Sequence, residues 1–336
     1  MRLNRVFAAL SLAILAGCGR PQSMFSPGGP AASHLANLGW FVFILFIVVA
    51  VIMWVLLGWA AVRRRGSFDE HAPVDVGGGQ PWVLIGGFAI PFVILAAVFV
   101  IGLDAMAEFP LAGPRETVPA EIRVTGHRWW WQINYVKGPL DQQIATANEI
   151  HIPIGRPVDI DLTSDDVIHS FFVPRLHGKV DLIPGQMNRI RIQATQPGVY
   201  RGQCAEYCGA QHAHMILIVV AQPPADYEAW MAQQIASAEE PATDQQRRGQ
   251  QLFLSKACVL CHTIRGTRAQ AKVGPDLTHI ASRQGLAANT LVNNEANLEA
   301  WVTHAQSLKP LAVMPDVNEF TGQEVRDLVA YLQQLR

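Results

Sequence analysis

The chain has 336 residues and a formal net charge of −1, which gives no indication of a nucleic-acid or other polyanionic partner. Half of the residues are hydrophobic and the mean hydropathy is +0.18, so we expect membrane segments in a chain long enough for two or three domains. Each of the five cysteines falls in a local motif, and none is left for a structural disulfide.

Residues 1–17 are predicted to be an export signal. Arg2 and Arg5 precede an apolar run that is too short to cross a bilayer. Small residues come directly before Cys18, as in a bacterial lipobox, in which the cysteine becomes the lipidated first residue of the mature chain. We therefore predict lipidation of Cys18. The alternative is an ordinary signal peptide with an incidental cysteine.

Two long apolar runs, about 38–62 and 82–106, predict a hairpin of transmembrane helices over residues 34–108. Three arginines, residues 63–65, follow the first run and place the intervening loop in the cytoplasm. Everything after the second run is then expected on the outer, periplasmic face of a bacterial inner membrane. Pro91 lies inside the second run and is expected to kink it.

Residues 115–222 contain short segments of alternating apolar and polar residues, separated by glycine and proline, which predict a small β-sandwich or barrel. Residues 223–243 are expected to be a linker with some helical character. The pattern from 244 to 336 is helical, and Thr321 with Glu324 three residues later predicts the start of the last helix.

A potential copper site lies before the end of the β region. Two thiolates, an imidazole and a thioether occur within twelve residues, on Cys204, Cys208, His212 and Met215. These soft donors suit copper, although a cysteine pair alone is more often buried or zinc-binding. His169 follows a strand beside apolar residues and is the best candidate for a second imidazole. His214 alternates away from the other donors and is a poor candidate.

The second motif, Cys258-Val259-Leu260-Cys261-His262, is the attachment signature of a c-type haem, with His262 as the proximal iron ligand. A thioredoxin-like reading fails because no βαβ pattern surrounds the motif. Met314 is the only methionine after the motif and is the preferred sixth ligand. His279 and His304 are the competing candidates.

The stretches around His169, Asp181 and Cys204 resemble subunit II of haem–copper cytochrome c oxidase, and residues 244–336 resemble class I cytochromes c. The resemblance implies a multidomain membrane protein with a transmembrane hairpin, a cupredoxin-like β-sandwich and an all-α cytochrome c domain. It also implies a dinuclear CuA centre that is bridged by Cys204 and Cys208 and completed by His169, His212, Met215 and the backbone carbonyl of Glu206. The family directs the side chain of that glutamate to a magnesium ion at the interface with subunit I.

Three consecutive tryptophans, residues 129–131, resemble an aromatic segment of the same family. The resemblance implies that electrons reach the copper centre through Trp129. The three side chains cannot all share one face of a strand, so at least one is expected to be exposed or at an interface, which leaves Trp129 and Trp130 as candidates. The alternative is a purely structural core strand.

The resemblance therefore implies subunit II of a proton-translocating cytochrome c oxidase of the caa type. Electrons would pass from a soluble or membrane cytochrome c, or from a bc complex, through haem c and CuA to subunit I, where oxygen is reduced to water. Subunits I and III and membrane lipids are the implied partners. Many family members have a glutamate seven residues before the proline of the second helix, where this chain has Leu84, which makes proton uptake through this subunit doubtful.

Four other functions compete with this one. A nitric oxide reductase can also carry CuA and differs in its catalytic partner. Nitrous oxide reductase would need a large histidine-rich domain that this sequence lacks, and quinol-oxidase subunits lack the copper ligands. An electron shuttle without a catalytic partner is disfavoured by the two closely linked apolar segments and by Glu206.

Overall fold

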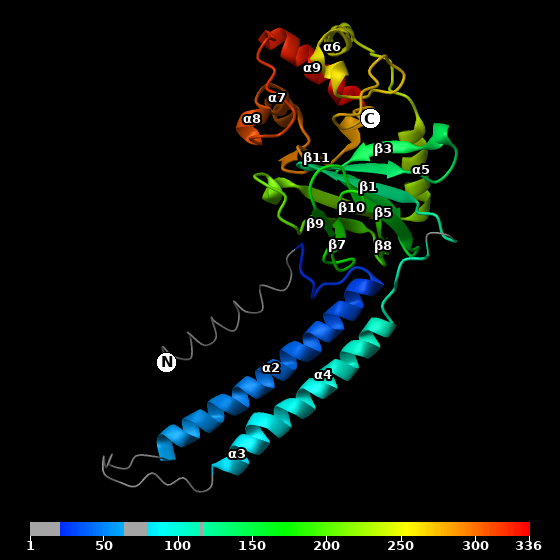
Figure 1. The fold of residues 1–336 in the computed structure, drawn as a ribbon. Coiled ribbons are helices and arrows are strands. Elements are labelled where there is room, and N and C mark those ends of the chain that lie inside the picture. Colours follow the sequence, from blue (N-terminus) through cyan, green and yellow to red (C-terminus); the bar gives the residue numbers. More distant parts are fainter. Residues whose placement is uncertain (1–20, 64–78, 115–116) are drawn as a thin grey trace, which may run out of the picture. The chain divides into compact units, whose positions relative to one another are not determined.

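The computed structural model describes residues 21–63, 79–114 and 117–336. The predicted signal and Cys18 lie outside these residues. The described residues divide into two compact units, one of Ser33–Phe109 and the other of Pro110–Arg336 together with residues 21–32 (Figure 1).

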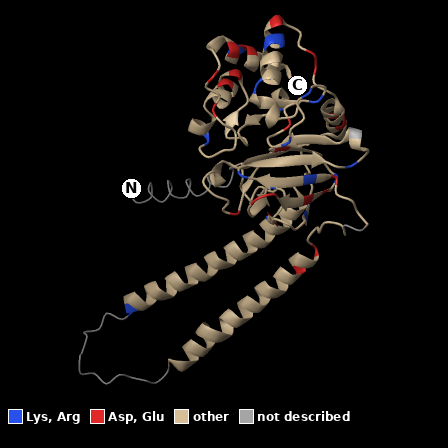
Figure 2. Cartoon of the chain, turned by 45° about the horizontal axis from the view of Figure 1, so that its top comes forward, with Lys and Arg blue, Asp and Glu red and all other residues tan. Residues whose placement is uncertain are grey.

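The unit of Ser33–Phe109 consists of helices that are long and apolar enough to cross a membrane. They are α2 (Pro30–Arg63) and a second, 28-residue helical run made of α3 (Gln80–Leu84), a π-helical turn (Ile85–Ala89) and α4 (Ile90–Ala107). The π-helical turn lies directly before Pro91, whose missing N–H interrupts the regular hydrogen-bond pattern. Figure 2 shows that charged residues occur only near the ends of these helices, with Arg63 in the last turn of α2.

The predicted β region is a sandwich and not a barrel, because its ten strands form two separate five-stranded sheets. The first sheet has the order β3 (Ile144–Ala147), β2 (Trp130–Tyr135), β1 (Ile122–His127), β5 (Val158–Ser164) and β8 (Asn188–Ile192). The second has the order β4 (Glu149–Pro153), β10 (Ile216–Gln222), β9 (Gly198–Cys204), β6 (His169–Phe172) and β7 (Val180–Leu182).

Alternation along the strands builds the core of this sandwich. Every second residue of β2 is buried, and Trp131, Ile133 and Tyr135 face the interior. Side chains from both sheets form one continuous apolar cluster, which also contains Cys204, Cys208 and Met215. The copper-motif residues therefore sit at the edge of the best-packed part of the domain.

The expected linker contains a helix that packs on the sandwich. Helix α5 (Pro224–Ile235) buries Tyr227 in the sandwich core, and Trp230 stacks on His151 with ring centroids 4.0 Å apart. The last strand of the sandwich and the next domain are thus joined by an ordered element.

Residues 244–336 form a second, helical core around α6 (Asp244–Ser255), α7 (Glu295–Thr303), α8 (Ala305–Leu308) and α9 (Gly322–Gln334). The predicted start of the last helix is confirmed, because Thr321 caps α9 in a capping box with Glu324. Helices α6 and α9 pack through Phe253 and Tyr331, whose rings lie 6.2 Å apart. One two-stranded hairpin, β11 (Gly285–Leu286) with β12 (Leu291–Val292), interrupts the helical pattern.

Candidate metal and haem sites

The sulfur and nitrogen donors of the copper motif converge on one point. Cys204 Sγ lies 3.8 Å from Cys208 Sγ, which is too far for a disulfide. Each sulfur has its own imidazole, with His169 Nδ1 3.9 Å from Cys204 Sγ and His212 Nδ1 3.6 Å from Cys208 Sγ. Met215 Sδ is 3.9 Å from Cys208 Sγ. The structure thus brings His169 together with the donors of the separate segment 204–215.

Strand pairing explains this convergence. β6 begins at His169 and pairs with β9, which ends at Cys204. The chain then turns through Cys208 and a short 3₁₀ helix, His212–His214, before β10 begins. The amide of Cys204 donates to the carbonyl of Met215 at 3.0 Å, which closes the loop on itself.

Hydrogen bonding favours release of one proton from the cysteine pair, although burial of both thiols opposes it. The hydrogen bond with Cys208 lowers the pKa of Cys204 to about 3, and its bond with His169 acts in the same direction. The pKa of Cys208 is raised, because its hydrogen bond with Cys204 and its burial both oppose a second thiolate beside the first. Two neighbouring thiolates repel each other, and a metal ion bound by them would supply the positive charge that stabilises both.

His169 is completely buried, and a carboxylate fixes its orientation. Asp166 Oδ1 lies 2.8 Å from His169 Nε2, which leaves Nδ1 directed at Cys204. Although burial opposes the charge, the hydrogen bonds to Cys204 and Asp166 raise the pKa of His169. Gly126 lies against the ring, and a Cβ atom there would be 2.6 Å from His169 Cδ2. Asp166 was not singled out from the sequence, although a carboxylate three residues before a candidate ligand is a usable signal.

Glu206 and His214 have different environments. The backbone carbonyl of Glu206 lies 3.2 Å from Cys204 Sγ, whereas its side chain is exposed and directed away from the core. His214 Nδ1 lies 2.6 Å from Gln211 Oε1, so its ring is engaged outside the donor cluster. The thioether of Met215 and the pair of thiolates favour copper over zinc for this donor set.

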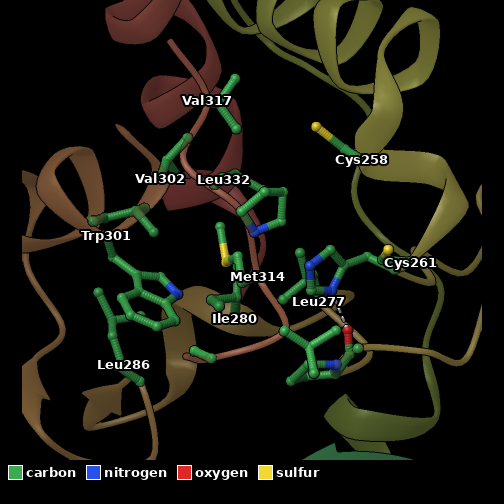
Figure 3. Close-up of a pocket in the computed structure, with 18 of the residues that line it drawn as sticks. Cys258, Cys261, Leu277, Ile280, Leu286, Trp301, Val302, Met314, Val317 and Leu332 are labelled. Carbon is green, nitrogen blue, oxygen red and sulfur yellow. Dashed lines mark hydrogen bonds between the residues drawn. The ribbon is translucent and has the colours of Figure 1, made fainter. Parts of the chain in front are cut away.

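The haem motif lines a cavity of about 520 Å³ in the helical domain. Figure 3 shows Met314 projecting into this cavity, with Trp301 and Leu286 on one side and Cys258 and Cys261 on the other. The surrounding side chains are mainly apolar, as a haem would require. Both cysteine sulfurs are unbonded, and burial raises the pKa of Cys258.

His262 is oriented as an axial ligand would be. Its Nδ1 lies 2.7 Å from the carbonyl of Pro275, which leaves Nε2 for a metal. Burial lowers the pKa of His262, so the imidazole is held neutral. The competing candidate His279 uses both ring nitrogens for the carbonyls of Arg336 and Ala236, at 2.7 and 3.0 Å. His304 bonds the hydroxyl of Thr303, and Met314 is the thioether that lines the cavity.

Trp129 connects the two sites. It lines the haem cavity, and its Nε1 donates to the carbonyl of Cys208 at 3.0 Å. Its side chain is buried beneath the helical domain, with 7% exposed. Gly209, at φ +112°, permits this approach, because a Cβ atom there would be 3.0 Å from Trp129 Cζ2. The tryptophan that the resemblance implicated is therefore at an internal interface.

The other two tryptophans differ in position. Trp130 is half-buried, lines the same cavity and stacks on His127 at 4.5 Å. Trp131 is fully buried in the sandwich core, and its Nε1 lies 3.4 Å from the carbonyl of Met215. Trp129 lies in the turn before β2, whereas Trp130 and Trp131 are consecutive residues of that strand and face opposite sides of it.

The fold and these two sites define a membrane-anchored electron-transfer protein with a thiolate–imidazole metal site and a haem-binding domain. Residues 136–222 match the family described as Cytochrome C oxidase subunit II, periplasmic domain, and residues 246–336 match the Cytochrome c family. The chain is 33% identical to cytochrome c oxidase subunit 2 of Alkalihalophilus pseudofirmus, over 96% of this chain and 94% of that protein.

A second relative, cytochrome c oxidase subunit 2 of Bacillus sp. (strain PS3), is 28% identical over 100% of this chain and 97% of that protein. The solved periplasmic domain of subunit II of cytochrome oxidase of Bradyrhizobium japonicum is 27% identical, with a TM-score of 0.32, over 34% of this chain and 93% of that one. The chain belongs to the cytochrome c oxidase subunit II family and carries a fused cytochrome c domain, so it is a subunit of an oxidoreductase complex. The named relatives favour an oxidase over a nitric oxide reductase.

Proposed function

We propose that this chain passes electrons from a cytochrome c, or from a bc complex, through haem c and CuA to subunit I of a respiratory oxidase, where oxygen is reduced to water. When bound, the haem and the copper pair supply two one-electron centres. The proposed copper ligands are His169, Cys204, the Glu206 carbonyl, Cys208, His212 and Met215. The proposed haem-binding residues are Cys258, Cys261, His262 and Met314.

The residues of this chain hold the two centres in fixed environments. Asp166 orients His169, the carbonyl of Pro275 orients His262, and the apolar walls of both sites exclude water. Neither site needs a large movement of the protein to change its charge by one electron. Ligands held in fixed positions in this way support an electron-transfer role.

The observation that carries the proposal is the position of Trp129. One side chain lines the haem cavity and also bonds the backbone of a copper-site cysteine. Because this indole is buried, a soluble cytochrome has little access to it. We therefore propose that the attached haem domain, and not a soluble cytochrome, donates to CuA.

The test is flash photoreduction of the haem in the assembled oxidase, with the appearance of reduced copper followed in the near-infrared. Trp129→Phe keeps a ring but removes the N–H that bonds the Cys208 carbonyl, and it is expected to slow the transfer. Trp230→Phe, on α5 and outside the lining of the haem cavity, is the matched control and is expected to leave the rate unchanged. Reduction of copper by a soluble cytochrome, with the haem bypassed, would contradict the proposal.

We also propose that the chain is anchored in a bacterial inner membrane with both metal domains on the outer face. The two apolar helices, Arg63 in the last turn of α2 and the two arginines that follow it in the sequence support this placement. The exposed side chain of Glu206 is available to a magnesium ion shared with subunit I, and subunit III is the other expected protein partner. Mass spectrometry of the mature N-terminus tests the predicted lipidation of Cys18.

A further inference from the structure

Lys309 is a lysine that the proposed electron path does not use, and it lies in an unusual place. Its side chain is 3% exposed, at the end of α8, next to the haem cavity. Among the residues that the structure describes, no carboxylate forms an ion pair with it. Burial lowers the pKa of Lys309 to about 7, although the nearby Cys208 acts in the opposite direction. Burying an ammonium group is unfavourable unless its donors are satisfied.

Three backbone carbonyls satisfy those donors. Lys309 Nζ donates to the carbonyls of Trp129 at 2.8 Å, His214 at 2.8 Å and Ala287 at 2.9 Å. An ammonium group has three donors, and here each has one acceptor. Two acceptors belong to the sandwich domain and one to the haem domain. Both sandwich acceptors adjoin the electron path, because Trp129 bonds Cys208 and His214 lies in the turn between His212 and Met215.

The haem-domain loop beside this lysine is strained. Three successive residues, Ala287, Ala288 and Asn289, have φ values of 52°, 59° and 56°. Left-handed backbone at a residue other than glycine costs about 1 kcal/mol or more and persists only where the surroundings hold it in place. These surroundings are in the other domain. The amide of Ile216 donates to the carbonyl of Ala288 at 3.3 Å, and Asn289 Nδ2 donates to the carbonyl of Asn148 at 2.8 Å.

We propose that Lys309 is a positioning residue that ties the haem domain to the backbone of Trp129 and to the copper-site turn, so that the two sites keep one fixed arrangement. This inference rests on the proposed electron path. A methionine of similar length would fill the same space, but it would leave the Trp129 carbonyl without its donor and the carbonyls of His214 and Ala287 with only the shared hydroxyl of Thr290. The fused domain is then a docked donor and not a freely tethered one.

The test compares Lys309→Met with the native chain, and Lys272→Met, at an exposed lysine of the same domain, is the control. The first readout is amide hydrogen exchange of the chain prepared without copper, and it needs no activity. Losing two cross-domain hydrogen bonds is expected to speed exchange of the Ile216 amide and of residues 287–290 at least about tenfold. Exchange in the β9–β10 pairing at Val219 and in the α9 core is expected to stay at the native level.

The second readout is the rate of electron transfer from haem c to copper in the assembled oxidase. Lys309→Met is expected to slow it while leaving the absorption bands of both centres unchanged. Native exchange in the variant would overturn the inference, and so would faster exchange with a native transfer rate. If the native oxidase itself shows no transfer between the two centres, the proposed function fails independently of Lys309.

A second variant keeps the inference testable if Lys309→Met does not fold. Asn289→Gly removes the side-chain bonds to the carbonyls of Asn148 and Ile216 and keeps the left-handed backbone accessible. Because it weakens the same interface from the neighbouring loop, it is expected to raise exchange at Ile216 in the same way. Native exchange and native transfer in this variant would contradict a docked arrangement.

Discussion

Adding one methyl group at Gly126 is expected to displace His169 from the copper donors. A Cβ atom at this position would lie 2.6 Å from His169 Cδ2 and 3.0 Å from its Cγ, whereas ordinary contacts begin at 3.4 Å. The imidazole would have to recede by about 0.8 Å, several times the ~0.2 Å within which metal–ligand distances normally fall. The ring has no free space, because it is completely buried and bonded to Asp166.

The assay for Gly126→Ala is copper titration of the purified chain, followed by near-infrared absorption and electron paramagnetic resonance. We expect a weakened and altered copper signal, an unchanged haem c spectrum and a loss of about 1–3 kcal/mol in the stability of the sandwich domain. Gly322→Ala is the control, because a Cβ atom there meets only the end of the Arg326 side chain at 3.4 Å. A native copper spectrum in Gly126→Ala would refute the assignment of His169.

Two further predictions concern the carboxylate that orients His169 and the proposed sixth ligand of the haem iron. Asp166→Asn removes the carboxylate beside His169 and is expected to weaken copper binding roughly 10- to 100-fold, whereas the exposed neighbour in Asp165→Asn is expected to have no effect. Equal copper affinity in the two variants would contradict this role. Met314→His is expected to lower the haem potential, within the ~0.8 V range that axial ligands command, in a spectroelectrochemical titration. A native potential in this variant would exclude Met314 as the sixth ligand.

Much of the local structure follows from short sequence patterns. The segments around 122–124, 158–162 and 189–192 alternate and form strands, whereas the continuous apolar run 216–220 forms a strand that is buried on both faces. Thr321 and Glu324 predict a helix start because the two side chains satisfy each other's backbone donors. The helix in the expected linker also has a signal, since Tyr227, Trp230 and Met231 share one face of α5.

No comparable sequence pattern predicts the interface between the sandwich and the haem domain. Lysine is rarely buried, so nothing in the sequence around Lys309 predicts its contact with three distant carbonyls. Likewise, strand geometry places Trp130 and Trp131 on opposite faces of β2, but it does not specify which domain covers Trp129 in the preceding turn. These features depend on contacts between residues that are 73 to 180 positions apart in the sequence, which only the folded chain reveals.

The central claim is that one chain holds two one-electron centres, and a spectrum tests it most directly. An oxidised-minus-reduced absorption spectrum of the purified full chain, from the visible to the near-infrared, would be recorded after copper loading, with metal analysis of the same sample. The account predicts a haem c signal together with a mixed-valence copper band, and two copper ions for each haem iron. A haem c signal without the copper band would contradict it, because the thiolate site would then not be CuA.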